Sequence, residues 1–505
     1  MDNTLVKSKI INYFKSMDQD KILEILFQVL IFSSFWGLIL PVVTVPGIGE
    51  LFLFRIAIVI FICYYLNVCI KEKKNPFKNR TKLEYAVFIL VGIMILYGII
   101  SLSIAIDVLF TFRRLFNLCI DILFFVLLLL YLDSRRKIKV TMFNCLINFI
   151  ALLSMGIYEA FFGGIFFETP NNFRSFNFFD KGLLFQPKAC FGNANDYSST
   201  ILFLLPFLIG FLLYLIKNTE NKFIKKFYSS ILVFITSVSY FIVIVTNARL
   251  VLVPIYIVSF GFAFYIIVYQ RKLKKILINC ILCIAFISIM DNYTDISILI
   301  KNHANTKKDI SSEIVVADVQ SETGTEDIVP EDEKSLTDQI FTIDADTNTV
   351  ILNKNTSAGL RASLLKFAIN TFIDSKGIGV GLGNTELLAK AISEDQFGGI
   401  WAIHCFPARI VADMGVFILI PIIIIIAMLL KKMINIILMY NKKKINISLL
   451  VLVTVISVLN FVFLATSPSD AQDLLGMWIS LAGIILAVIR IPSLYYDNIE
   501  VVSKI

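Results

Sequence analysis

The chain has 505 residues, of which 57% are hydrophobic and 17% are charged, and its mean hydropathy is +0.81. This composition excludes a soluble enzyme of this size and indicates an all-α polytopic integral membrane protein. The formal net charge is +8, and basic residues gathered at one membrane face account for it, so nucleic-acid binding is not expected.

Apolar stretches long enough to span a membrane recur about twelve times along the chain. In chain order they cover roughly 22–45, 51–70, 83–105, 112–132, 140–160, 197–216, 228–247, 250–269, 276–292, 403–430, 446–466 and 473–490. The first stretch is too long for a signal-peptide core and has no small-residue cleavage site. We therefore expect it to be retained as a span.

Every second connection between these stretches is basic. The segments 71–82, 135–139, 217–226, 271–275 and 431–444 each carry four to six lysines or arginines. The positive-inside rule places such connections in the cytoplasm, and both termini with them.

A long outer loop separates the ninth expected span from the tenth. Within it, 301–349 is rich in Asp, Glu, Ser and Thr and is expected to be a solvated, disordered insert. The following part, 357–400, has apolar residues at helical spacing over 361–372 and 387–392, which predicts short amphipathic helices on the outer face. The expected division of the chain is thus nine spans in 1–290, the outer loop in 291–402, and the last three spans with a cytoplasmic tail in 403–505.

Arg249 is the most unusual charge, because it lies in an apolar run and has no acidic neighbour in sequence. An arginine in such a place is a functional-site hypothesis, although it could instead extend to lipid headgroup phosphates. Arg361, at the start of an expected outer helix, is either a second functional cation or a solvated helix-end charge.

Polar residues also gather around the start of the tenth expected span. His404 is one of two histidines, and Arg409 and Asp413 follow it. The i,i+4 spacing of Arg409 and Asp413 predicts a salt bridge, which leaves His404 available at the interface. Cys405 lies beside it, and whether Cys405 pairs with Cys190 is left open.

Two further segments look like turns. The glycine run 377–383, which ends at Asn384, lacks the lysine and the strand–helix context of a nucleotide loop, so a bend that lets the backbone approach a neighbour is expected. Asn193 and Asn195 precede the sixth span, where asparagines can also simply cap a helix.

The order of these features resembles the O-antigen ligase and O-antigen polymerase family of bacterial membrane enzymes, over about 191–417. By resemblance, Asn193 and Asn195 match the family's Gly-Asn-Pro-Asn turn, Arg249 its Ser-Arg turn, Arg361 the arginine before its Gly-x-Gly-x-Gly-Asn bend, and His404 the histidine that opens its next helix. Ala194 departs from the family's proline. Cys405 departs from the Asn or Ser that usually follows the histidine.

The resemblance implies a GT-C-like glycosyltransferase of the bacterial cytoplasmic membrane. It would transfer a glycan from an undecaprenyl-pyrophosphate-linked oligosaccharide to an acceptor at the outer face, with inversion and without metal or other cofactor. Its partners would be this lipid-linked oligosaccharide, membrane lipid, and the flippase and chain-length regulator of the same pathway. Under this hypothesis Arg249 and Arg361 bind the diphosphate, His404 is the base, and Asn193, Asn195, Asn384 and Arg409 bind substrate.

Three activities remain as alternatives. The departure at Cys405 favours a repeat-unit polymerase over a ligase that transfers glycan to a lipid, protein or cell-wall acceptor. A flippase or transporter is disfavoured, because the spans contain few charged residues at bilayer depth and no evident inverted repeat.

Overall fold

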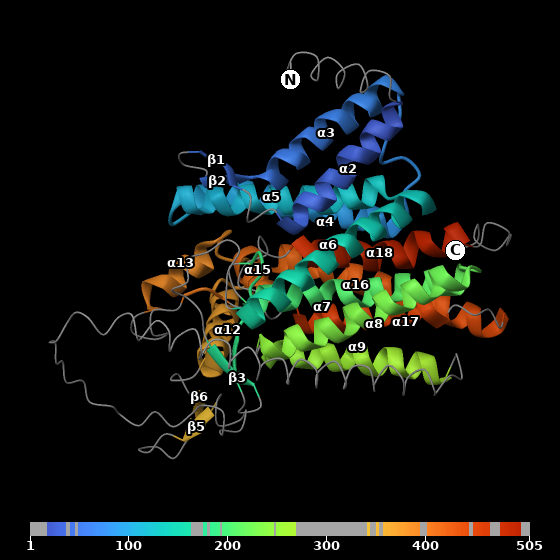
Figure 1. Cartoon of the computed structure of the whole chain (residues 1–505). Coiled ribbons are helices and arrows are strands. Elements are labelled where there is room, and N and C mark those ends of the chain that lie inside the picture. The colour runs from blue at the N-terminus through green and yellow to red at the C-terminus, as the bar shows by residue number, and fades with distance from the viewer. Residues whose placement is uncertain are drawn as a thin grey trace, which may run out of the picture.

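The computed structural model describes residues 18–36, 41–45, 49–162, 175–178, 182–191, 194–246, 249–268, 341–343, 350–352, 357–393, 401–403, 405–443, 448–464 and 475–495. Across these residues the architecture is a bundle of long helices, with a group of short elements at one end (Figure 1).

The bundle helices follow the apolar stretches of the sequence. They are α2 (Gln19–Trp36), α3 (Leu53–Lys71), α4 (Lys82–Ser101), α5 (Val108–Tyr131), α6 (Arg135–Phe162), α7 (Ala194–Asn218), α8 (Lys222–Val245), α9 (Arg249–Val268), α16 (Val416–Lys443), α17 (Ser448–Leu464) and α18 (Leu475–Tyr495). A 3-10 turn, η1 (Leu102–Ile104), extends α4.

Seven helices of the described part of the chain are long and apolar enough to cross a membrane, namely α3 to α8, with α4 counted together with η1, and α16. Shorter apolar segments lie within α9, α17 and α18. Several membrane-crossing helices are what a multi-pass membrane protein requires. The count of twelve spans stays a prediction, and the stretch 276–292 lies outside the described residues.

The prediction for the first span was wrong at its C-terminal end. The helix α2 ends at Trp36, and a hairpin of β1 (Pro41–Val45) and β2 (Gly49–Phe52) follows where the span was expected to continue. Pro41 has no backbone N–H for a helix ladder, and the run of Val and Thr after it favours an extended chain. Hydropathy alone does not separate these two conformations.

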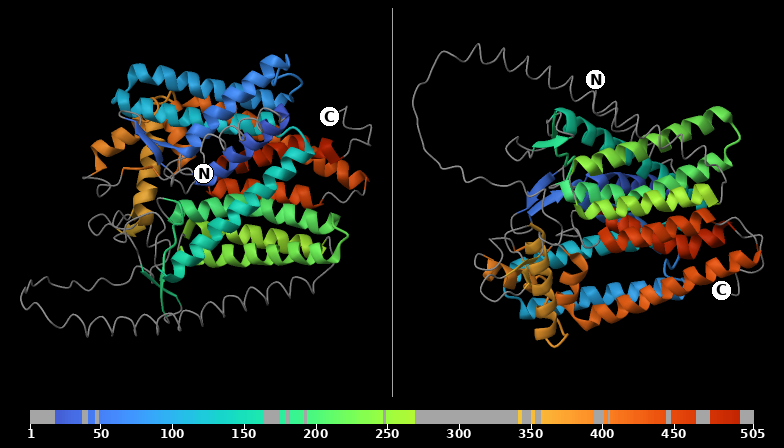
Figure 2. Two further views of the ribbon diagram at one scale, coloured as in Figure 1. Left: turned by 45° about the horizontal axis from the view of Figure 1, so that its top comes forward. Right: turned by 90° about the horizontal axis from the view of Figure 1, so that it is seen from below.

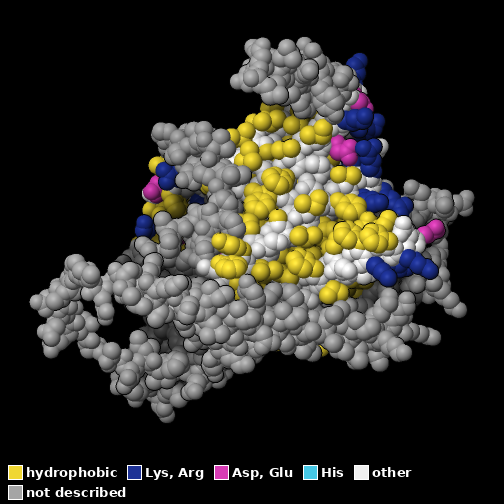
Figure 3. Space-filling view, viewed as in Figure 1, with side chains coloured by type: hydrophobic (Ala, Val, Ile, Leu, Met, Phe, Trp, Pro, Cys, Tyr) yellow, Lys and Arg dark blue, Asp and Glu magenta, His cyan; other side chains and the backbone are white. Residues whose placement is uncertain are grey.

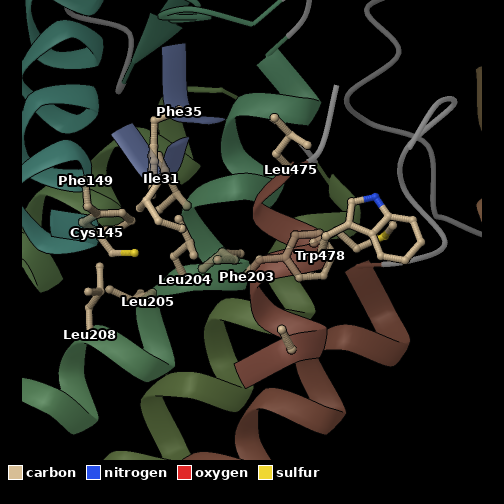
Figure 4. Packing of buried hydrophobic residues seen from close by; sticks show 14 of the residues in the cluster. Ile31, Phe35, Cys145, Phe149, Phe203, Leu204, Leu205, Leu208, Leu475 and Trp478 are labelled. Carbon is tan, nitrogen blue, oxygen red and sulfur yellow. The ribbon is translucent and has the colours of Figure 1, made fainter. Parts of the chain in front are cut away.

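The centre of the bundle is α7, which packs against α6, α8, α9, α17 and α18. Figure 4 shows Ile31 and Phe149 on one side of the α7 leucines and Trp478 of α18 on the other. Gly210 of α7 lies directly against Val453 of α17. Small residues at such contacts let helices approach closely, which is how helices gain packing energy in lipid.

The two ends of the bundle differ in charge. Figure 3 shows apolar side chains over the flank of the bundle and lysines and arginines along one end, where the connections α3–α4, α5–α6 and α7–α8 lie. Exposed apolar side chains along the helices are expected to face lipid, and Ile89 in the middle of α4 and Phe260 in the middle of α9 are among them. Which end faces the cytoplasm stays a prediction from the positive-inside rule.

The opposite end carries the short elements. Helix α12 (Ser357–Asp374) runs across the ends of the bundle helices (Figure 1, Figure 2). It is followed by α13 (Asn384–Ala391) and α15 (Phe406–Met414). The hairpins β1–β2, β3 (Ser175–Phe178)–β4 (Gly182–Phe185) and β5 (Phe341–Ile343)–β6 (Val350–Leu352) lie at this end as well. Apart from β5, the acidic insert 301–349 lies outside the described residues.

Candidate functional site

A glycine-rich bend connects α12 to α13. Gly377, Gly379, Gly381 and Gly383 all have positive φ, between 77° and 100°. The bend lies directly against the end of α15, because the Gly381 N–H donates to the Asp413 carbonyl oxygen at 2.9 Å. It is the close backbone approach that the glycine spacing predicts, and only glycine adopts this conformation without strain.

The tenth expected span, 403–430, is not one helix. It is broken at Gly415, where φ is 66°, into α15 and α16. The Val416 N–H then donates to the Gly377 carbonyl oxygen at 2.8 Å, so the break holds the bend in place. A side chain at position 415 would meet the carbonyl oxygens of Gly377 and Ile378.

Gly415→Ala is expected to lower the free energy of unfolding by about 1–3 kcal/mol from backbone strain, because alanine disfavours this φ and its methyl group displaces the bend. The measurement is the unfolding midpoint of the detergent-purified protein. Gly92→Ala on α4 is the control, since a side chain there meets nothing within 4 Å. Equal midpoints for the two variants would contradict the role of the break.

Asn384 begins α13 and is buried. Its amide nitrogen donates to the carbonyl oxygens of Ile104 at 3.0 Å and Val380 at 2.7 Å, and its amide oxygen accepts from the Ile106 N–H at 3.1 Å. These bonds tie the bend to the connection between η1 and α5. Asn384 therefore supports the site, and its contact with substrate stays a prediction.

Asp413 stabilises the start of α13 from the neighbouring helix. One carboxylate oxygen accepts from the Gly383 N–H at 3.0 Å, and the other accepts from the Thr385 hydroxyl at 2.6 Å. A carboxylate is favourable at a helix N-terminus. Burial raises the pKa of Asp413 to about 6, whereas these hydrogen bonds and the charge of Arg409 act in the opposite direction.

Arg409 and Glu386 form the centre of a buried charge cluster. The Arg409 Nη1 lies 3.1 Å from Glu386 Oε1, and the Arg114 Nη2 lies 2.7 Å from Glu386 Oε2. The side chain of Glu386 is only 2% exposed. The i,i+4 spacing pointed to Asp413 as the partner of Arg409, but the ion pair described is with Glu386, and Asp413 acts on Arg409 through its charge.

Sequence reasoning missed Arg114 and Glu386. Arg114 carries the same signal as Arg249, since it lies inside an apolar stretch of spanning length. Glu386 has no such signal, because an acidic residue in the first turn of a short helix is ordinary. A small cavity of about 20 Å³ lies beside the cluster, lined among others by Asp121, Phe406 and Ile410.

The structure places the expected catalytic residues only in part. Arg361 lies in the first half of α12, half-buried, and burial lowers its pKa. Arg249 begins α9, but its side chain lies outside the described part, as do His404 and Asn193. Asn195 is half-buried in the first turn of α7. The convergence of Arg249 and Arg361 on one diphosphate therefore stays a prediction.

The two cysteines considered as a disulfide pair, Cys190 and Cys405, are not bonded to each other. Cys190 and Cys405 are both free thiols. The Cys190 thiol donates to the Phe35 carbonyl oxygen at 3.3 Å, which fixes it to the end of α2. The structure therefore contains no disulfide between Cys190 and Cys405.

No family model matches this chain. It is 22% identical over 445 residues to the teichuronic acid biosynthesis protein TuaE of Bacillus subtilis. The aligned region covers 88% of this chain and 79% of TuaE. The similarity is thus weak, but it extends over most of both chains and is not confined to one group of spans.

Proposed function

We propose that the protein takes part in the synthesis of a cell-envelope polysaccharide. The observation that carries this proposal is the similarity to a teichuronic acid biosynthesis protein over 88% of the chain. The motif resemblance to O-antigen ligases and polymerases points to the same class of process.

Within that class, the reaction we propose is repeat-unit polymerisation at the outer face of the bacterial cytoplasmic membrane. A hydroxyl oxygen of the acceptor glycan attacks the anomeric carbon of an undecaprenyl-pyrophosphate-linked oligosaccharide. The bond from that carbon to the pyrophosphate oxygen breaks, the configuration inverts, and His404 takes the hydroxyl proton. Arg249 and Arg361 stabilise the negative charge that develops on the leaving diphosphate.

The position of the short elements supports this proposal. Helix α12 with Arg361, the glycine-rich bend and the Arg114–Glu386–Arg409 cluster all lie at the end of the bundle away from the basic connections. By the positive-inside rule this is the outer end, where a lipid-linked sugar is used after it has crossed the membrane.

The test is an assay with the full chain in lipid nanodiscs and a synthetic undecaprenyl-pyrophosphate-linked repeat unit as the substrate. A polymerase gives a ladder of glycan lengths and releases one undecaprenyl pyrophosphate for each bond formed. Transfer only to an added lipid, protein or cell-wall acceptor would assign a ligase. In sealed vesicles, movement of the intact substrate across the bilayer without release would assign a flippase, and either result rejects the polymerase.

His404→Ala is expected to lower kcat about 10²- to 10⁴-fold while the KM for the lipid-linked substrate changes little, because a base acts on the acceptor proton and not on substrate binding. His303→Ala removes the other histidine of the chain and is the matched control. Full turnover by the His404 variant would leave this residue at most a positioning role.

A further inference from the structure

A larger cavity shares one lining residue, Asp121, with the small cavity beside the charge cluster. Its volume is about 260 Å³, and it is lined by residues of α2, β2, α3, α5, α7 and α18 and of the turn before α7. The lining includes Phe35, Phe52, Phe54, Phe191, Arg55, Asn117, Asp121 and Thr200. None of these residues belongs to the site described above except Asp121, which lines both cavities.

The charged and amide groups of this cavity come from two neighbouring helices, α3 and α5. Arg55 Nη2 donates to the Asn117 amide oxygen at 2.8 Å, and the Arg55 guanidinium lies over the rings of Phe52 and Phe116. Asp121, one helical turn beyond Asn117, is 4% exposed, and its charge interacts with Arg55. A buried carboxylate is costly in an apolar bundle, and this one is placed at a cavity wall.

The mixture of groups indicates the class of ligand. A carboxylate only accepts hydrogen bonds, a guanidinium only donates them, and an amide does both. Sugar hydroxyls both donate and accept, and the C–H faces of a sugar ring pack on aromatic side chains. Asp121 would repel a phosphate, and Arg55, which would attract one, already donates to Asn117 and interacts with Asp121. A lipid tail would gain nothing from the polar groups.

We propose that this cavity binds a sugar ring of the glycan substrate, with Asp121 and Asn117 as its hydrogen-bonding residues. The volume is close to the lower end of small-molecule sites, about 300 Å³, so it suits one or two rings and not a whole lipid-linked repeat unit. Because Asp121 also lines the small cavity, the bound sugar lies next to the Arg114–Glu386–Arg409 cluster. This inference deepens the proposed function and depends on it for the identity of the glycan.

The test is titration calorimetry on the full chain in nanodiscs. The probe is the lipid-free and phosphate-free oligosaccharide repeat unit, obtained by partial hydrolysis of the envelope polysaccharide of the source organism. The wild type is expected to bind it, and Asp121→Asn and Asn117→Ala are each expected to weaken binding at least tenfold. Asn117 is only half-buried, so its truncation tests the cavity even if the Asp121 variant fails to fold.

Asp107→Asn is the matched control, since it makes the same change on the same helix. Asp107 caps α5 through the Phe110 N–H, and asparagine caps equally well, so binding should not change. Absence of binding by the wild type, equal binding by the folded cavity variants, or displacement of the probe by inorganic pyrophosphate would each overturn the inference. If the protein polymerises the repeat unit but does not bind the free oligosaccharide, only the sugar-binding role of the cavity is rejected. If it binds the oligosaccharide through Asp121 but does not polymerise the repeat unit, only the proposed function is rejected.

Discussion

Glu386→Ala is expected to lower the free energy of unfolding by about 3–5 kcal/mol, because it removes a buried carboxylate that two arginines contact. Glu386 joins Arg114 of α5 to Arg409 of α15, at 2.7 Å and 3.1 Å. The side chains of Arg409 and Arg114 are 7% and 17% exposed, so water cannot replace the lost partner well. The measurement is the midpoint of denaturant unfolding of the detergent-purified protein.

Glu24→Ala is the control, because it removes an ion pair of similar length whose side chains are more exposed to solvent. Glu24 lies 2.9 Å from Arg136, whose side chain is 76% exposed, and such surface pairs contribute about 0–1 kcal/mol. Glu386→Gln separates charge from shape, because it keeps the volume and removes the charge; we expect it to be destabilised as well. If Glu386→Ala is as stable as Glu24→Ala, the Arg114–Glu386–Arg409 cluster does not contribute measurably to the stability of the fold.

This cluster explains why the short elements at this end of the bundle stay together. The helices α13 and α15 are only eight and nine residues long, which is too short for stability on their own. Asp413 accepts hydrogen bonds from the Gly383 N–H and the Thr385 hydroxyl at the start of α13. Glu386 joins α13 to α5 and α15 through its ion pairs with Arg114 and Arg409. These buried polar bonds thus add to the apolar contacts by which Leu382, Ile410 and Met414 join the bundle.

The sequence was informative where one physical pattern dominates. Apolar stretches such as 83–105 and 197–216 became helices α4 and α7, since a chain in lipid must satisfy its own backbone hydrogen bonds. The same pattern failed at 41–45, where proline and β-branched residues override hydropathy, and at Gly415, where one residue divides an apolar run. Periodicity averages over a window and does not detect a single such residue.

In the candidate site, local features such as the glycine-rich bend could be predicted from the sequence, but the ion pairs between distant segments could not. The spacing of Gly377 to Gly383 indicated a close-approach bend, because glycine adopts positive φ without strain and has no side chain to block a neighbouring backbone. The pairing of Arg409 with Glu386 was missed, because local spacing offers Asp413 while the tertiary fold brings Glu386 from another helix. Contacts between distant segments depend on how helices pack, and one sequence does not show that.

The prediction with the largest effect on activity concerns the arginines. Arg361→Ala and Arg249→Ala are each expected to lower kcat/KM for the lipid-linked substrate at least 10²-fold, because a guanidinium that faces developing diphosphate charge in a low-dielectric site contributes several kcal/mol to the transition state. Burial lowers the pKa of Arg361, which is consistent with such a site. The measurement is polymer yield and undecaprenyl pyrophosphate release at equal protein levels in the membrane.

The matched control for Arg361 is Lys366→Ala, which removes an exposed cation from the same helix and should leave the rate unchanged. Arg361→Lys keeps the charge but loses the planar pair of donors that fits a phosphate, so it should recover only part of the rate. If Arg249 and Arg361 bind one diphosphate, the double variant should lose less than the two single losses combined, because the effects of residues on a shared ligand are not additive. Strictly additive losses would place the arginines on separate groups, and normal polymer length and yield from either single variant would remove that arginine from the reaction.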